Sequence, residues 1–288
     1  MSVTFYANSI QKVGFDAAAE PSISDQVATM SGGETTGALY DLLDNRRTNK
    51  LSIDTSGETQ AATIQIETTA AIGCTAAIID NHNLKSADAN YILGESASVI
   101  AITSAYSGTL GSAMSADTLG GAGGNTLVTV VADGISLCRF DIITGDTWQW
   151  VINDTDTFDA DITMGEICLS APFAPAFNPE LQWLNGYDMP GSSYRESEGG
   201  QRYGFSTHTN ARKSWRMTWK YMSDTNKGLL QDIFLFTRGT RNPFYIDLSG
   251  PLGAATPQLF YVRFMKPLSF TGLTKDAWQV SIDIEEEI

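Results

Sequence analysis

Residue types that catalyse reactions or bind metals are few and widely spaced in this chain. Its two histidines, His82 and His208, each lack a second His or a Cys at the spacing of a zinc site. His82 lies in the sequence DNHNL, directly after an apolar stretch, and His208 lies in THTN. Short Asn and Asp side chains hydrogen-bond their own backbone in turns. We therefore expect polar turns at both histidines, and a ligand for a metal or a polar molecule is the alternative.

The densest group of carboxylates is Asp154, Asp156, Asp159 and Asp161. Alternate aspartates supply oxygen ligands to Ca²⁺, but an EF-hand that begins at Asp154 requires Gly at its sixth position and Glu at its twelfth. Those positions hold Asp159 and Gly165. The sequence therefore favours a solvated loop over a calcium site. Two carboxylates for glycoside hydrolysis need only lie close in space, and no particular pair is indicated here.

Motifs of the common catalytic classes are missing from the sequence. The chain lacks GxSxG, HExxH and CxxC. Residues 108–125 contain six glycines, but no helical pattern with an apolar face follows, so we do not expect a phosphate-binding loop. We expect no catalytic, cofactor-binding or metal-binding residues, no cofactor and no enzymatic activity.

The cysteines and tryptophans are expected in the core. Cys74, Cys138 and Cys168 are odd in number, lie far apart and do not have metal-site spacing. They behave as small hydrophobes when buried, which fits a protein folded in a reducing cytoplasm. Trp148 and Trp150 place two indoles on one face of an expected strand. Exposed indoles stack on sugar rings, but buried indoles are more common, so we expect both in the core.

Composition and charge narrow the class of protein. Of 288 residues, 42% are hydrophobic and 18% are charged, as in a globular protein with a core. The chain has no run of 18 apolar residues, so we expect no transmembrane helix. It does not start with a basic region followed by an apolar one, so we expect no secretory signal. The net charge of −15 opposes tight binding to nucleic acids. Residues 1–175 hold 6 Lys and Arg against 21 Asp and Glu, whereas residues 176–288 hold 12 of each.

The chain is expected to form two separately folding domains, residues 1–175 and 176–288. Composition and charge both change near residue 175, where Pro172, Pro175 and Pro179 interrupt regular structure. The alternative interpretation of the charge difference is that an acidic face merely keeps the first domain soluble. Glycine- and serine-rich residues at 191–193 and 199–200 predict a loop that becomes ordered on assembly.

The clearest periodicity lies between Trp215 and Tyr221. Every odd position is large and apolar or aromatic and every even position is polar, so we expect a strand with one buried and one wet face. Arg216, Thr218 and Lys220 would line the wet face. Polar N-cap residue types at 223–226 and four apolar positions then predict a helix over 225–238, stopped at Gly239.

Further strands are expected after the helix. They lie in FTRGTRNPFYIDL, FYVRFMKPLSF and AWQVSIDIEEE, which end at residues 248, 270 and 287. This order of a Trp-rich strand, a helix and these strands over residues 190–288 resembles the C-terminal domain of tail proteins of tailed bacteriophages, of the distal-tail or minor-tail kind. The resemblance implies a β-domain that helps to form a ring at the end of the tail tube.

The first part of the chain reads as many short strands separated by turns. Residues 62–67, 74–79, 98–102, 126–131, 135–143 and 147–151 are rich in Val, Ile, Thr and aromatics, with turns at 133–134 and 144–146. The segments ALYDLLDNRRTNKLSID, ATIQIE, AAIIDNHNL and GEICLSAPFAP resemble the galactose-binding-like jelly roll over residues 25–175. Leu51 stands where that family usually has a Trp, so sugar binding does not carry over with the resemblance.

The sequence therefore predicts a mainly β protein, with a jelly-roll-like sandwich followed by a β-domain with one packed helix. The tail resemblance implies a structural component of a phage tail tip, baseplate or tube end, folded in the host cytoplasm and located in the virion. Its partners would be copies of itself in a ring and other tail proteins. The alternative is a glycan-binding adsorption module that contacts the host surface. An accessory domain of a cell-wall hydrolase is a third hypothesis, weakened by the missing nucleophile motifs.

Overall fold

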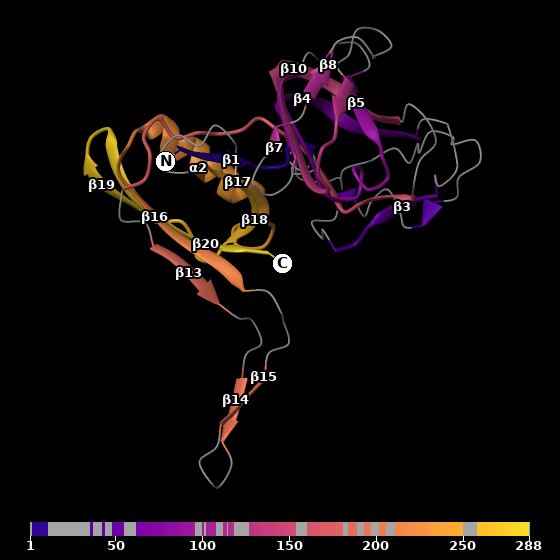
Figure 1. Ribbon diagram of the computed structural model, residues 1–288. Coiled ribbons are helices and arrows are strands. Elements are labelled where there is room, and N and C mark those ends of the chain that lie inside the picture. Colours follow the sequence, from indigo (N-terminus) through magenta and orange to yellow (C-terminus); the bar gives the residue numbers. More distant parts are fainter. Residues whose placement is uncertain are drawn as a thin grey trace.

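The computed structural model describes most of the chain. The described residues are 2–10, 35–36, 42–43, 48–54, 62–95, 100, 102–107, 112–113, 115–117, 127–153, 160–180, 184–188, 193–196, 202–205, 211–249 and 258–287. The protein is mainly β, with curled antiparallel sheets and one helix with described bounds, as the sequence predicts. Figure 1 shows two β-bodies side by side and a thin ribbon that extends from one of them. None of the helical segments described is long and apolar enough to span a membrane.

The C-terminal sheet contains seven described strands, all paired antiparallel. Their order is β1 (Ser2–Tyr6), β17 (Phe244–Ser249), β18 (Leu259–Phe264), β20 (Ala277–Glu286), β16 (Arg212–Met222) and β13 (Leu184–Asp188), with β19 (Phe270–Thr274) on β20. One face packs into a core with Trp215, Met217 and Trp219, which confirms the predicted buried face of β16.

The predicted alternation fails at the end of β16. Tyr221 is 70% exposed, and Met222 is buried in its place. The pairing of β16 with β20 changes register between Trp219 and Met222, where Met222 pairs with Trp278. A bulge adds a residue to one strand and so reverses the face of every position beyond it. Tyr221 is therefore on the surface, contrary to the prediction.

Helix α2 (Asp224–Phe236) packs on the core face of the C-terminal sheet through Leu230 and Ile233. It begins at the N-cap Ser223, whose hydroxyl accepts a hydrogen bond from the Asn226 amide. The helix stops at Thr237, because Arg238 and Gly239 both adopt positive φ and the Gly239 amide bonds back to the Phe234 carbonyl. The predicted helix 225–238 is thus correct in type but ends too late.

The N-terminal sheet is built around two very long strands, β4 (Ala62–His82) and β10 (Gly134–Asn153). It also contains β12 (Glu166–Ser170), β5 (Asn90–Glu95), β9 (Leu127–Thr129), β8 (Ser115–Asp117), β6 (Ile102–Ser107) and β7 (Ser112–Ala113). A smaller sheet of β11 (Ile162–Met164), β3 (Leu51–Ile53) and β2 (Thr35–Thr36) shares its core. The more specific match to a galactose-binding-like jelly roll stays a prediction.

One predicted turn in this sheet is confirmed, and another is revised together with the strands around it. The turn at 133–134 is confirmed, and Gly134 has a φ of +102° that favours glycine. The predicted turn at 144–146 is instead an irregular part of β10, since Thr144 and Gly145 stay paired with β4 across register shifts. The predicted strands 135–143 and 147–151 therefore belong to one strand. Likewise, 62–67 and 74–79 belong to β4.

Strand β1 connects the two bodies in a way that composition does not indicate. It is N-terminal in sequence, but it completes the edge of the C-terminal sheet by pairing with β17. Phe5 also forms a two-way backbone bridge with Phe173 in the proline-rich segment. The domain boundary at residue 175 stays a prediction. Residues 1–175 nevertheless include β1, a strand that belongs to the C-terminal sheet. We therefore expect the two halves to unfold together.

Candidate assembly surface

The described candidates for catalysis or metal binding from the sequence do not come together in one site. His82 is buried, and its Nδ1 accepts a hydrogen bond from the Leu84 amide at 3.3 Å, as expected for a turn. Burial lowers the pKa of His82 to about 4, so its ring is neutral near pH 7. Among the residues that can be placed, no three His, Cys, Asp or Glu side chains gather as metal ligands.

Several predicted candidates fall where the structure gives no description. His208, Asp154, Asp156 and Asp159 lie outside the described residues, and the solvated-loop prediction stays untested for them. Asp161 is exposed, and its backbone carbonyl accepts a hydrogen bond from Nδ2 of the Asn83 side chain at 2.7 Å. Asp161 therefore helps to hold the turn that carries His82.

The tryptophans and cysteines of the N-terminal body are core residues, as predicted. Trp148 and Trp150 are fully buried, so neither offers a platform for a sugar ring. All three cysteines are free and buried, and burial raises the pKa of Cys74 and Cys138 to about 12. Their thiols are therefore protonated and unreactive in the folded protein.

The wet face of β16 carries a row of ion pairs with β20 and its neighbours. Arg216 donates to Asp283 through two nitrogens, with Nη2 2.9 Å from Oδ2, and Lys266 binds the same carboxylate at 2.6 Å. Hydrogen bonds from Arg216, supported by Lys266, lower the pKa of Asp283 to about 2. Further pairs join Arg212 to Glu285, Lys220 to Glu180 and Arg263 to Glu287. We call this row the ion-pair face; it confirms the predicted exposure of Arg216 and Lys220.

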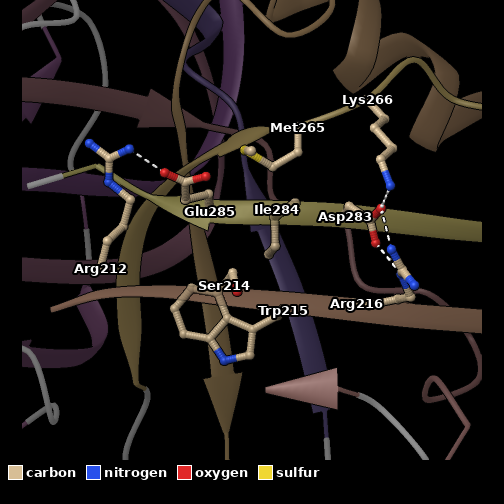
Figure 2. Close-up of a pocket in the computed structure, with 9 residues that line it drawn as sticks. All are labelled: Arg212, Ser214, Trp215, Arg216, Met265, Lys266, Asp283, Ile284 and Glu285. Carbon is tan, nitrogen blue, oxygen red and sulfur yellow. Dashed lines mark hydrogen bonds and ion pairs between the residues drawn. The ribbon is translucent and has the colours of Figure 1, made fainter. Parts of the chain in front are cut away.

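A pocket opens in the middle of the ion-pair face. Figure 2 shows Arg212 and Glu285 on one side of it and Arg216, Asp283 and Lys266 on the other. Met265, which has the exposed apolar side chain of this lining, lies between these pairs in Figure 2. The full lining is Arg212, Ser214, Trp215, Arg216, Met265, Lys266, Asp283, Ile284 and Glu285, of which Trp215 and Ile284 are core residues. We call it the ion-pair pocket. An apolar centre within a charged rim is the usual anatomy of a protein–protein contact.

The ion-pair face continues into the contact between the two bodies. On the β17 and β18 side of the same sheet face, Tyr245 and Tyr261 are buried against the N-terminal sheet, together with Tyr6 from β1. Tyr245 donates a hydrogen bond to Asp80 at 3.2 Å, and Tyr261 donates to Glu166 at 3.4 Å. Burial raises the pKa of Tyr245 well above its ordinary value, so its hydroxyl keeps the proton that it donates.

An ion pair completes this contact between the bodies. Arg139 of β10 donates to the Tyr6 hydroxyl at 2.6 Å and to Asp247 of β17 at 3.0 Å. Asp247 is almost fully buried, so loss of its cation would leave a buried charge. The two bodies are therefore held by specific polar contacts around an apolar centre and not by a loose linker.

A two-stranded ribbon projects away from the C-terminal sheet (Figure 1). Strands β14 (Ser193–Glu196) and β15 (Arg202–Phe205) pair only with each other among the described strands. They extend the hairpin of β13 and β16, and Figure 1 shows them far from both sheets. The sequence predicts a loop from its Gly- and Ser-rich residues at 191–193 and 199–200, whereas β14 begins at Ser193. The alternation of Tyr203 and Phe205 around Gly204 is the pattern in the sequence that indicates a strand.

Comparisons with known proteins identify no family for this chain. No protein-family model matches the chain, and no curated protein matches it significantly.

Proposed function

We propose that this chain is a structural component of a bacteriophage tail, at the tail tip, baseplate or tube end. In this proposal it is not an enzyme, and it acts by assembling with copies of itself and with other tail proteins in the virion. The sequence resemblance of residues 190–288 to phage tail proteins supplies the biological setting. The surface features of the structure supply the physical support for assembly.

The projecting ribbon is the observation that carries the proposal. A two-stranded β-ribbon is at best marginally stable in water, because each strand has one unpaired edge and no sheet beneath it. The β14–β15 ribbon stands clear of both sheets in Figure 1. Contact with another chain would cover these edges and give the ribbon a defined position. An enzyme that works alone has no need of such an extension.

The charge distribution fits a tail component that does not hold DNA. The acidic residues are concentrated in residues 1–175, where the excess over basic residues is 15. Such a surface repels phosphate, so any contact with a passing genome would be brief. The alternative function, glycan binding at the host surface, has no described support, because Trp148 and Trp150 are buried.

A hairpin truncation tests this proposal. Replacing residues 189–211 by Asn-Gly joins Asp188 to Arg212, which are already paired, through a two-residue turn. We expect the truncated chain to keep the melting temperature of the wild type and to self-associate more weakly, measured by light scattering after size exclusion. A wild type that stays monomeric at tens of micromolar and does not join a tail complex would contradict the proposal. Hydrolysis of peptidoglycan or polysaccharide that one carboxylate substitution abolishes would contradict it too.

A further inference from the structure

Self-association needs two complementary surfaces, and the structure contains a second candidate surface besides the ribbon. We propose that copies of this chain associate head to tail, with the bulge of β10 around Ile142 entering the ion-pair pocket of the next copy. This inference rests on the proposed function, because it specifies how the self-association in that function occurs. It concerns described residues only and does not depend on the ribbon.

The bulge presents an exposed apolar side chain in a stretch of β10 that also holds two exposed acids. Along β10 the pairing passes from Arg139 opposite Ala76 to Ile143 opposite Cys74, so β10 has extra residues here. Such bulges re-aim side chains and are retained features of a fold. Ile142 is 70% exposed as a result, and the nearby Asp141 and Asp146 are exposed as well. One exposed isoleucine means little by itself; its acidic neighbours give it a recognisable pattern.

The ion-pair pocket has the complementary pattern. Its exposed apolar side chain is Met265, which is 47% exposed and lies between the two groups of charged residues (Figure 2). Arg216 and Lys266 share the single carboxylate of Asp283, so that side of the pocket keeps an excess of positive charge. An aliphatic side chain flanked by carboxylates therefore fits both the centre and the rim.

The charge of the two halves favours a second copy as the occupant. The bulge lies in the half of the chain with 21 acidic and 6 basic residues, and the pocket lies in the half with 12 of each. A head-to-tail contact places an acidic half against a balanced half, whereas a symmetric contact between two N-terminal halves would place acid against acid. Head-to-tail contacts close into rings when the rotation between copies permits, which is the form the proposed function requires.

The experiment exchanges charges between the two surfaces. Asp141→Lys places a cation on the bulge, and Arg216→Glu places an anion at the pocket; both side chains are exposed. Each variant alone opposes like charges at the contact, so we expect its dissociation constant for self-association to rise at least about tenfold. In an equimolar mixture every contact between unlike copies pairs opposite charges, so we expect assembly to return. Asp276→Lys, a reversal in the exposed turn before β20, is the control and should assemble like the wild type.

Rescue by mixing separates this inference from simple loss of stability, because a misfolded variant is not restored by a second one. Ile142→Glu is an additional test, since the side chain is exposed in its own chain and its replacement should weaken assembly without lowering the melting temperature. If the wild type assembles and both charge variants assemble equally well, the head-to-tail contact is wrong and the proposed function stands. If the mixture of variants stays dissociated, the contact is also wrong. A wild type that does not self-associate would contradict both.

Discussion

Truncation of Trp219 tests the assignment of the two faces of β16. The indole is only 3% exposed, it packs against Phe5 with ring centroids 6.4 Å apart, and its Nε1 donates to the Phe177 carbonyl at 2.9 Å. Removing a buried aromatic costs about 3–5 kcal/mol, since the core closes only partly around the cavity. At about 2–4 °C per kcal/mol for a chain of this size, Trp219→Ala should lower the melting temperature by roughly 10 °C.

A neighbouring residue on the opposite face provides the comparison. The Arg216 side chain is 53% exposed, and its ion pair with Asp283 is screened by water, so Arg216→Ala should change the melting temperature only slightly. Trp219→Phe should lie between the two variants, because it keeps most of the buried ring area and loses one hydrogen bond worth about 1 kcal/mol. Thermal melts followed by circular dichroism measure all three. A larger shift for Arg216→Ala than for Trp219→Ala would refute the assignment of faces.

Three further outcomes follow from the contacts. The pKa of Asp283 is about 2 when folded and about 3.9 in an unfolded chain, so its ion pairs stabilise the fold fully above about pH 5. That contribution, about 1 kcal/mol after allowance for solvent screening, should be lost progressively between about pH 5 and pH 1 in wild-type melts and be absent in Asp283→Asn. Tyr245→Phe should destabilise the protein by about 1–3 kcal/mol, since the buried Asp80 loses a hydrogen bond, whereas Tyr221→Phe on the surface should change nothing. A thiol reagent should label the three cysteines only after denaturation; rapid labelling of the native protein would show that they are not buried.

Local patterns in the sequence predict the elements of this fold but not their partners. The alternation from Trp215 to Trp219 predicts the buried face of β16 because period two follows from strand geometry alone. The same pattern wrongly places Tyr221 in the core, since a bulge depends on the register with β20 and not on β16 itself. Helix α2 is predicted for a similar reason: its cap and apolar positions are local signals.

Long-range pairing explains the other differences. Val3 and Phe5 alternate with Ser2 and Thr4, which indicates a strand, but its pairing with β17 joins opposite ends of the chain. The contact of Tyr245 and Tyr261 with buried carboxylates is also not predictable from the sequence, because tyrosine is found both in cores and on surfaces. The candidate assembly surface could therefore be predicted only in part, through the polar positions Arg216 and Lys220.

The ion-pair pocket required the structure. Its rim combines residues of β16 and β20 with the turn after β18, which carries Met265 and Lys266. No spacing in the sequence brings these three segments together. By contrast, the absence of GxSxG, HExxH and CxxC motifs can be read from the sequence alone.

Cryo-electron microscopy of purified tailed-phage particles whose genome encodes this chain would test the proposed tail location most directly. If the proposed function is right, such particles contain several copies of this chain in a symmetric arrangement at the tail, with each copy in contact with the next and with the β14–β15 ribbon covered by another chain. Particles in which this chain is absent would contradict the account, as would single copies that leave the ribbon without a partner.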